Sequence, residues 1–205
     1  YTDMQKLGLK LSPEEIYSIN NSSLKDAIFQ LIGEGGAGFC TGEIVSPKGL
    51  MFTNHHCGYE AIATLSSTEN NYLDDGFWAK SHDEEIAVPG LSVSRVVRIE
   101  NVTDRVLEDI SFETEESERG QLVADRIKTI KDEATADTHY KANVKEMYQG
   151  GEYYLFVYEV FGDVRFVGAP PSSIGKYGGD TDNWMWPRHN GDFSIFRVYM
   201  TPDGM

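Results

Sequence analysis

The chain has 205 residues, of which 40% are hydrophobic, and a formal net charge of −15 at pH 7. This length and apolar content can build one sizeable core, which argues against disorder throughout. Clustered Lys and Arg are absent, so nucleic-acid binding is not expected, and no run of about 20 apolar residues predicts a membrane helix. The first residue is Tyr1, with no basic and apolar leader, so we expect any signal peptide to have been removed.

The N-terminal region is predicted to be helical. Ser12-Pro13-Glu14-Glu15 combines an N-cap serine, a proline at the first helical position and a glutamate at the third, which predicts a helix start. Apolar residues on one face between Leu24 and Ile32, with Gly33 after them, predict a second helix.

A β-hairpin is predicted next. Residues 41–46 and 50–53 have strand-like composition, and the Pro and Gly of residues 46–49 favour a reversing turn. The hairpin leads to His56, and a histidine that follows a paired strand has the fixed backbone that a general base needs. This arrangement indicates the base of a serine peptidase; the alternative is a buried structural histidine bonded to the backbone. We interpret the neighbouring His55 as structural.

The two cysteines, Cys40 and Cys57, both lie in the hairpin region. Antiparallel neighbours can come within bridging range, and closing a loop of this length stabilises by ~3 kcal/mol on the chain-entropy model. We predict a disulfide between them, which would imply an oxidising compartment. The alternative is two reduced, buried thiols, as expected in a cytosolic protein.

The middle of the chain is predicted to contain both helices and strands. The pattern predicts a short helix, a polar loop, a strand, a long helical stretch and two further strands, at residues 60–65, 66–75, 91–99, 104–148, 152–161 and 163–167.

The C-terminal stretch supplies a carboxylate for the histidine. Asp192 follows Gly191 and precedes a strand-like run, and a histidine base needs such a partner to hold its tautomer. The alternative is that Asp192 only caps the turn at Gly191. The predicted helical stretch explains the long separation from His56, because loop-closure entropy grows only logarithmically with loop length.

Three strings of residues carry a resemblance to a known family. They are TGEIVS at 41–46, TNHHCG at 53–58 and the unusual run GGDTDNWMWPRHNGD at 178–192. Together they resemble the dipeptidyl-peptidase 7 and 11 family of bacterial serine peptidases, and the similarity covers nearly all of the chain. The strand after Asp192 also resembles the one that carries the triad aspartate in chymotrypsin-like peptidases.

The resemblance implies a mainly β fold with a helical insertion, namely the first chymotrypsin-like β-barrel of a trypsin-like double-barrel peptidase. The expected segments are an N-terminal helical segment, the first part of the barrel with His56, the helical insertion, and the rest of the barrel with Asp192: residues 1–33, 34–103, 104–150 and 151–205. The implied activity is release of dipeptides from the free N-terminus of peptides, with His56 as general base and Asp192 as its orienting partner.

The resemblance also implies that Asn183 and Trp184 hold the free α-amino group of the substrate. A side-chain carbonyl can accept from the ammonium, and an aromatic face adds a cation–π attraction of ~0.5–2 kcal/mol. The alternative is that these residues belong to a packed aromatic corner.

The chain departs from the family pattern in one respect, since no Gly-Asp/Asn-Ser-Gly element occurs in it. We therefore expect an N-terminal piece that is inactive alone, with the nucleophilic serine in the C-terminal remainder of the same enzyme. No cofactor is expected. The resemblance places the protein in the periplasm or on the outer surface of a Gram-negative bacterium, and it allows a homodimer of the full-length protein, on which the residues are silent.

Two alternatives from other classes remain. One is a metal site made of His55, His56, His189 and Asp192, although neither HExxH nor CxxC…CxxC spacing is present. The other is a non-catalytic peptide-binding module, in which the same barrel keeps the amine pocket without the chemistry.

Overall fold

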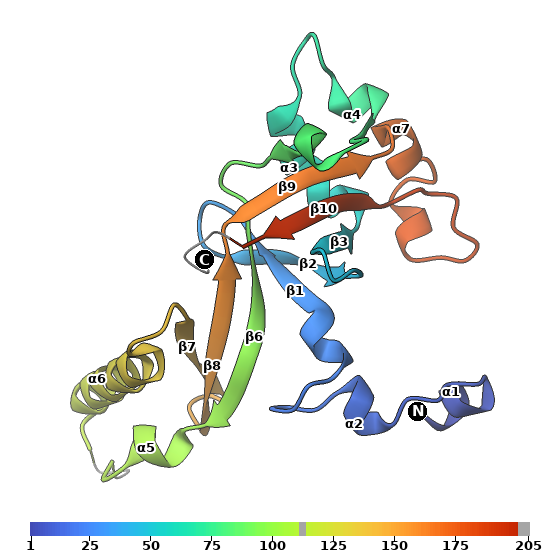
Figure 1. The fold of residues 1–205 in the computed structure, drawn as a ribbon. Helices are drawn as coiled ribbons and strands as arrows, with labels where there is room; N and C mark the ends of the chain where they lie inside the picture. The colour runs from blue at the N-terminus through green and yellow to red at the C-terminus, as the bar shows by residue number, and fades with distance from the viewer. Residues whose placement is uncertain (111–113, 201–205) are drawn as a thin grey trace. The chain divides into compact units, whose positions relative to one another are not determined.

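The computed structural model describes residues 1–110 and 114–200 and consists mainly of antiparallel β-strands with several short helices and one long one (Figure 1). The chain divides into two compact units, each made of two separate stretches. Unit 1 contains Tyr1–Asp26 and Arg95–Val160, and unit 2 contains Ala27–Ser94 and Phe161–Met205. Every residue proposed for the site belongs to unit 2.

The strands of unit 2 form a curved antiparallel sheet. Their order is β4-β9-β10-β3-β2-β1-β6, and β5 also pairs with β9. The strands are β1 (Ile28–Ile32), β2 (Gly38–Ile44), β3 (Leu50–Thr53), β4 (Phe77–Trp78), β5 (Ile86–Ala87), β6 (Ser92–Asn101, which continues into unit 1), β9 (Asp163–Ala169) and β10 (Ser194–Tyr199).

The core of unit 2 shows that this sheet curls on itself. Val93 of β6 and Phe166 of β9, from strands five places apart in the order, belong to one buried cluster. Side chains from the strands between them fill the same cluster: Phe29, Leu31, Met51 and Phe196. Along β9, Val164, Phe166 and Gly168 are buried and the residues between them are half-buried, as the period of two in a strand requires. The expected fold class, a mainly β protein with a chymotrypsin-like barrel, is confirmed.

Short helices lie at the ends of these strands. They are α3 (His55–Leu65), α4 (Tyr72–Asp75), α7 (Ser172–Gly175) and the 3₁₀ turns η2 (His82–Glu84) and η3 (Thr181–Asn183). The helix α3 follows β3 directly and is the one that carries His56.

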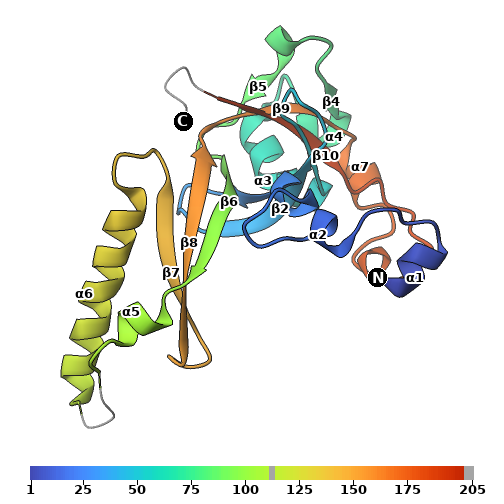
Figure 2. The same cartoon turned by 60° about the horizontal axis from the view of Figure 1, so that its bottom comes forward.

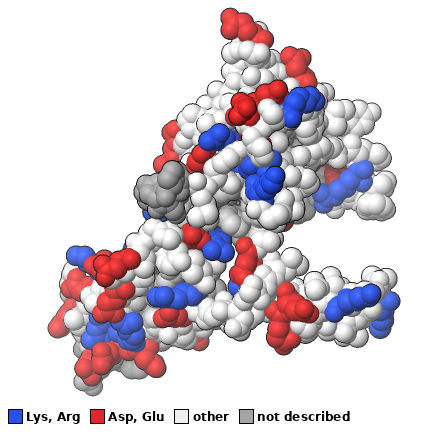
Figure 3. Space-filling view, viewed as in Figure 1, with Lys and Arg blue, Asp and Glu red and all other residues white. Residues whose placement is uncertain are grey.

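Unit 1 has its own small core. Its elements are α1 (Thr2–Lys6), α2 (Pro13–Ile16), the turn η1 (Leu24–Ala27, ending in unit 2), α5 (Thr103–Leu107), α6 (Glu116–Thr135), β7 (Lys141–Met147) and β8 (Glu152–Phe161). The helix α6 lies along β7 and β8 in both views, and Ile130 packs with Val144 and Leu155 (Figures 1 and 2). On the face shown in Figure 3, basic and acidic side chains intermingle over α6 and do not form the basic patch that nucleic acids need.

Several predicted elements are confirmed. The start of α2 has both bonds of a capping box, because Ser12 Oγ accepts from the Glu15 amide and the Glu15 carboxylate accepts from the Ser12 amide. The hairpin, the strand near residues 91–99 and the two strands after residue 151 are present as β2–β3, β6, β8 and β9.

The predicted helix at residues 24–32 is wrong. Only the turn η1 occupies its first part, and Ile28–Ile32 is the strand β1, between β2 and β6. Phe29 and Leu31 are buried while Ile28 and Gln30 are exposed, so the period that the barrel uses here is two.

The predicted helical stretch at 104–148 is also too long. Helix ends at Thr135, and Lys141–Met147 pairs with β8 along seven residues. Two smaller corrections concern the neighbourhood of the site: α3 begins at His55, five residues earlier than expected, and the loop predicted at 66–75 contains α4. The four-segment division of the chain stays a proposal.

Candidate active site

The pairing of two strands brings His56 and Asp192 together. In the antiparallel ladder of β3 and β10, Thr53 lies opposite Ser194. The strand β3 ends where β10 begins, so the residues just after Thr53 and just before Ser194 emerge at the same edge of the sheet. His56 is three residues beyond Thr53, and Asp192 is two residues before Ser194.

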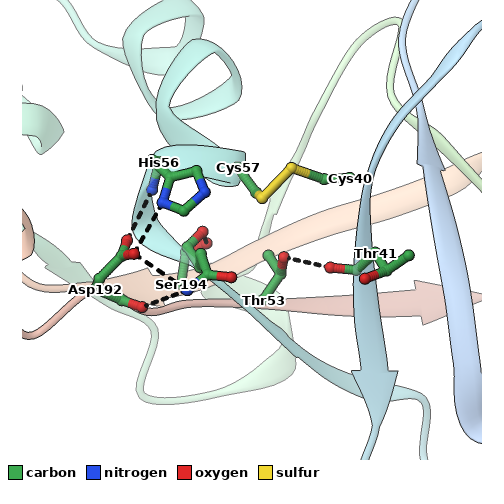
Figure 4. The surroundings of a disulfide bond; sticks show 8 residues. Cys40, Thr41, Thr53, His56, Cys57, Asp192 and Ser194 are labelled. Carbon is green, nitrogen blue, oxygen red and sulfur yellow. Dashed lines mark hydrogen bonds and ion pairs between the residues drawn. A yellow bond between two sulfur atoms is a disulfide. The ribbon is translucent and has the colours of Figure 1, made fainter. Parts of the chain in front are cut away.

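The carboxylate of Asp192 binds both the ring and the backbone of His56 (Figure 4). Its Oδ2 lies 2.8 Å from His56 Nδ1, and its Oδ1 accepts from the His56 amide at 3.0 Å. Asn54 Nδ2 donates to Oδ2 at 3.1 Å. Because the carboxylate accepts, Nδ1 carries the proton and the neutral ring has its lone pair on Nε2.

Asp192 thereby also caps the helix α3. The first amides of a helix lack intrahelical partners, and a carboxylate at this end is stabilised by the helix dipole. Asn54 is the N-cap residue, but its side chain makes no capping bond within the helix and instead donates to Asp192. A residue remote in sequence therefore takes the place of a local cap.

The start of α3 is packed tightly on β10. Ser194 is fully buried, and its Oγ donates to the carbonyl of Asn54 at 2.9 Å. A Cβ added to Gly58 would lie 2.5 Å from that oxygen. Only glycine at position 58 allows this close approach, which fixes the helix turn that carries His56 against the strand that follows Asp192.

The exposure of the two side chains differs as a base and its orienting partner require. The side chain of Asp192 is 16% exposed, whereas that of His56 is 58% exposed. Within the described ranges, His56 Nε2 has no hydrogen-bond partner, so it is available to accept a proton from a reacting group. Orienting carboxylate, fixed tautomer and accessible nitrogen together make a histidine that can act as a general base.

His55 differs from its neighbour in burial. It is 3% exposed, and a Cβ added to Gly175 would lie 2.6 Å from its ring. Burial lowers the pKa of His55 below its ordinary value, although a backbone hydrogen bond and Asp192 oppose this. A neutral, enclosed imidazole of this kind fits a structural role.

Cys40 and Cys57 form a disulfide with a Cα–Cα distance of 6.0 Å. Cys57 lies on α3 and not on a hairpin strand, so the bridge joins a strand to a helix. It ties the first turn of α3 to β2, directly after His56.

A cavity of about 750 Å³ opens beside His56. Residues from β2, from α3, from α7 and from the segment between α7 and β10 line it: Phe39, His55, His56, Cys57, Tyr59, Glu60, Ser172, Gly175, Lys176, Gly179, Asp180, Asn183, Asn190 and Asp192. The cavity brings Asn183 into the same space as His56 and Asp192. Sequence reasoning did not single out Lys176 and Asp180, which form an ion pair of 2.9 Å at its wall.

The two residues expected to hold an amine are placed differently. Asn183 lines the cavity, and its backbone carbonyl accepts from the Arg188 guanidinium at 2.7 Å. Trp184 is 84% exposed and is not one of the described residues that line the cavity. Both residues follow Asp182, which is buried and joins their segment to His189. Its carboxylate accepts from the backbone N–H of His189, and this hydrogen bond lowers the pKa of Asp182.

In the part of the chain that the structure describes, no group of three or more His, Cys, Asp or Glu is placed to hold a metal ion. The same residues contain no helix long and apolar enough to cross a membrane.

A chymotrypsin-like barrel with a His–Asp pair at the edge of its sheet defines the class of this molecule, a barrel of the serine-peptidase type. The model of the family Peptidase S46 matches residues 1–205, and the chain belongs to that family. A dipeptidyl-peptidase 7 of Capnocytophaga gingivalis is 54% identical over 202 residues, which are 98% of this chain and 28% of the relative. An Asp/Glu-specific dipeptidyl-peptidase of Flavobacterium psychrophilum is 48% identical over 97% of this chain and 27% of its own length.

A solved structure is similar along the whole chain. It is that of DPP11 from Porphyromonas endodontalis in complex with substrate, with a TM-score of 0.77 and 45% identity, covering 99% of this chain and 30% of the other. The chain thus spans less than a third of the length of these relatives.

Proposed function

We propose that this chain is the N-terminal part of a serine exopeptidase that releases dipeptides from the free N-terminus of peptides. The observation that carries the proposal is the contact of 2.8 Å between His56 Nδ1 and Asp192 Oδ2, with Nε2 of the same ring left accessible. The names of the relatives, which are dipeptidyl-peptidases, support the substrate class.

In this proposal His56 acts first as a base and then as an acid. Its Nε2 takes the proton of a serine hydroxyl supplied by the remainder of the enzyme, as that oxygen attacks the scissile carbonyl. The resulting imidazolium then gives the proton to the departing amine, which leaves an acyl-enzyme. Water, deprotonated by the same nitrogen, hydrolyses that ester and releases the dipeptide. The Asp192 carboxylate accepts from the Nδ1–H and stabilises the imidazolium.

Asn183 is proposed to hold the α-ammonium of the substrate, with Trp184 as a further contact. The side-chain carbonyl of Asn183 can accept from the ammonium inside the cavity that contains His56. Trp184 is largely exposed, so a cation–π contact needs the substrate, or the rest of the enzyme, to approach its ring. An anchor for the terminal amine fixes the distance to the bond that is cleaved.

The location of the protein is part of the same proposal. A disulfide beside the site is typical of proteins in oxidising compartments, which supports the periplasm or the outer surface of a Gram-negative bacterium.

The test compares three preparations on fluorogenic dipeptide substrates. The full-length enzyme should cleave them when their N-terminus is free and not when it is acetylated, and His56→Ala in that enzyme should abolish turnover. Purified residues 1–205 should show none, because they supply no nucleophile. Turnover by the fragment would refute the proposed division of the site, and full activity of His56→Ala would refute the assignment of the base.

A further inference from the structure

A second cavity adjoins the first in unit 2. Its volume is about 300 Å³, and its lining residues are Gly33, Glu34, Phe39, Cys57, Glu60, Ala61, Thr64, Val88, Pro89, Gly90 and Leu91. Three of these, Phe39, Cys57 and Glu60, also line the first cavity. The two cavities therefore adjoin at these residues, beside Cys57 of the Cys40–Cys57 disulfide, and we call the second cavity the disulfide groove.

The disulfide groove leads away from the proposed amine site. Its lining includes Ala61 and Thr64, which lie further along α3 than His56, whereas Asn183 lines only the first cavity. From His56 to Thr64 the helix rises about 12 Å. In Figure 4 Asp192 lies on one side of His56 and the disulfide on the other.

This direction is the one that the leaving part of a peptide must take. With the terminal amine at Asn183, a dipeptide extends about 7 Å before the bond to be cleaved. The residues after that bond continue past His56, away from the amine site. The 12 Å along α3 can accommodate about three of them in an extended conformation.

The residues that line the disulfide groove favour particular side chains in the leaving part of the peptide. Glu34 and Glu60 are its charged lining residues, and neither has an ion-pair partner in the described ranges. Glu34 lies against Gly90, where an added Cβ would be 2.3 Å from Glu34 Cγ. Apolar surface comes from Phe39, Val88 and Leu91. Long aliphatic stems with a cationic head, those of Lys and Arg, match an apolar wall that ends in carboxylates.

We propose that the disulfide groove is a subsite for the leaving peptide, in which Glu34 and Glu60 favour Lys or Arg among the first three residues after the cleaved bond. The inference rests on the proposed function, because it takes the direction of the substrate from the amine site. It adds a selectivity that acts on the released peptide and not on the dipeptide.

The experiment uses the full-length enzyme and pairs of peptides that share their N-terminal dipeptide. One peptide of each pair has Lys and the other Glu at the second position after the cleaved bond, and kcat/KM is measured from dipeptide release. The Lys peptide should be preferred, and Glu34→Gln and Glu60→Gln should each reduce the preference about two- to fivefold, the range of exposed ion pairs. Added salt should reduce it too. The matched control is Glu69→Gln, an exposed glutamate that lines neither cavity.

A fluorogenic dipeptide, which has no leaving peptide, separates this inference from the proposed function. Its turnover should be the same in wild type, in Glu34→Gln, whose residue lines only the disulfide groove, and in the control. Equal kcat/KM for the Lys and Glu peptides, or a preference that survives in the double variant, would overturn the subsite while leaving the dipeptidyl-peptidase activity intact. Absence of turnover on every substrate would overturn both.

Discussion

Replacing Asp192 with asparagine tests the role of the carboxylate with little change in shape. The carboxylate accepts from the His56 amide with Oδ1 and from His56 Nδ1 and Asn54 with Oδ2. The side chain of asparagine has one oxygen and one NH₂ group, so it can replace only one of the two accepting oxygens. If its oxygen faces the His56 amide, its NH₂ donates to Nδ1, which puts the ring proton on Nε2 and removes the base.

The opposite orientation has a structural cost. An amide oxygen facing Nδ1 would keep the correct tautomer, but the NH₂ would then face the backbone N–H of His56, and two donors would meet at the helix start. In the first orientation the new NH₂ meets the side-chain NH₂ of Asn54, but that side-chain amide can turn to present its oxygen, whereas the backbone N–H of His56 is fixed at the helix start. An unsatisfied group there costs about 1–3 kcal/mol, so the first orientation should prevail. Loss of the correct tautomer lowers kcat about 10⁴-fold in Ser–His–Asp triads, equivalent to about 5.5 kcal/mol of transition-state stabilisation.

The assay is steady-state turnover of a free dipeptide substrate by the full-length enzyme, with circular dichroism to show that the fold is retained. The matched control is Asp75→Asn, an exposed aspartate of α4 that does not line the cavity beside His56, which should behave as wild type. A folded Asp192→Asn enzyme that keeps more than about a tenth of wild-type kcat would show that the carboxylate does not orient the base.

Three further predictions concern other parts of unit 2. Replacing Cys40 and Cys57 together with serine should lower the free energy of unfolding by about 3 kcal/mol on the chain-entropy model, measured by urea denaturation; an unchanged midpoint would contradict it. Asn183→Ala should raise KM for substrates with a free N-terminus more than it lowers kcat, and equal loss in both would argue for a role in chemistry instead. The folded-state pKa of His55 is lowered by burial, so its stabilising contribution is present above the unfolded pKa of about 6.5 and is lost as the pH falls through the folded pKa. His55→Gln should therefore flatten the decline of unfolding free energy between pH 7 and 5, and an unchanged pH dependence would count against burial as the cause.

The sequence predicts those parts of the fold that local chemistry determines. The cap of α2 involves residues three apart, and strand β8 alternates buried and half-buried side chains along its whole length. Both signals are readable within a short window. His56 lies in a motif just after β3, and Asp192 lies in a motif just before β10. The motifs predict that the two residues meet, although nothing local in the sequence shows that β3 and β10 are neighbours.

The wrong predictions concern segments whose secondary structure depends on pairing with neighbouring strands. The residues of β1 contain apolar side chains at spacings that fit a helix as well as a strand, and pairing with β2 on one side and β6 on the other selects the strand. The same holds for β7, which follows a true helix and pairs with β8. The support of the candidate site by Asn54 and Ser194 was also missed, since their partners are remote in sequence. The TNHHCG string contained Asn54, but only the fold assigns its bond.

The contact between Gly58 and Ser194 limits how this region can change in evolution or in the laboratory. Any larger residue at position 58 needs space that the hydroxyl of Ser194 occupies, and a Ser194→Gly substitution that frees this space removes the bond to the Asn54 carbonyl. The space between positions 58 and 194 therefore fits only a limited total side-chain volume, and we expect a substitution at one position to be tolerated only with a matching change at the other. Directed evolution of selectivity has more freedom among the exposed residues of the grooves than at this joint between helix and strand.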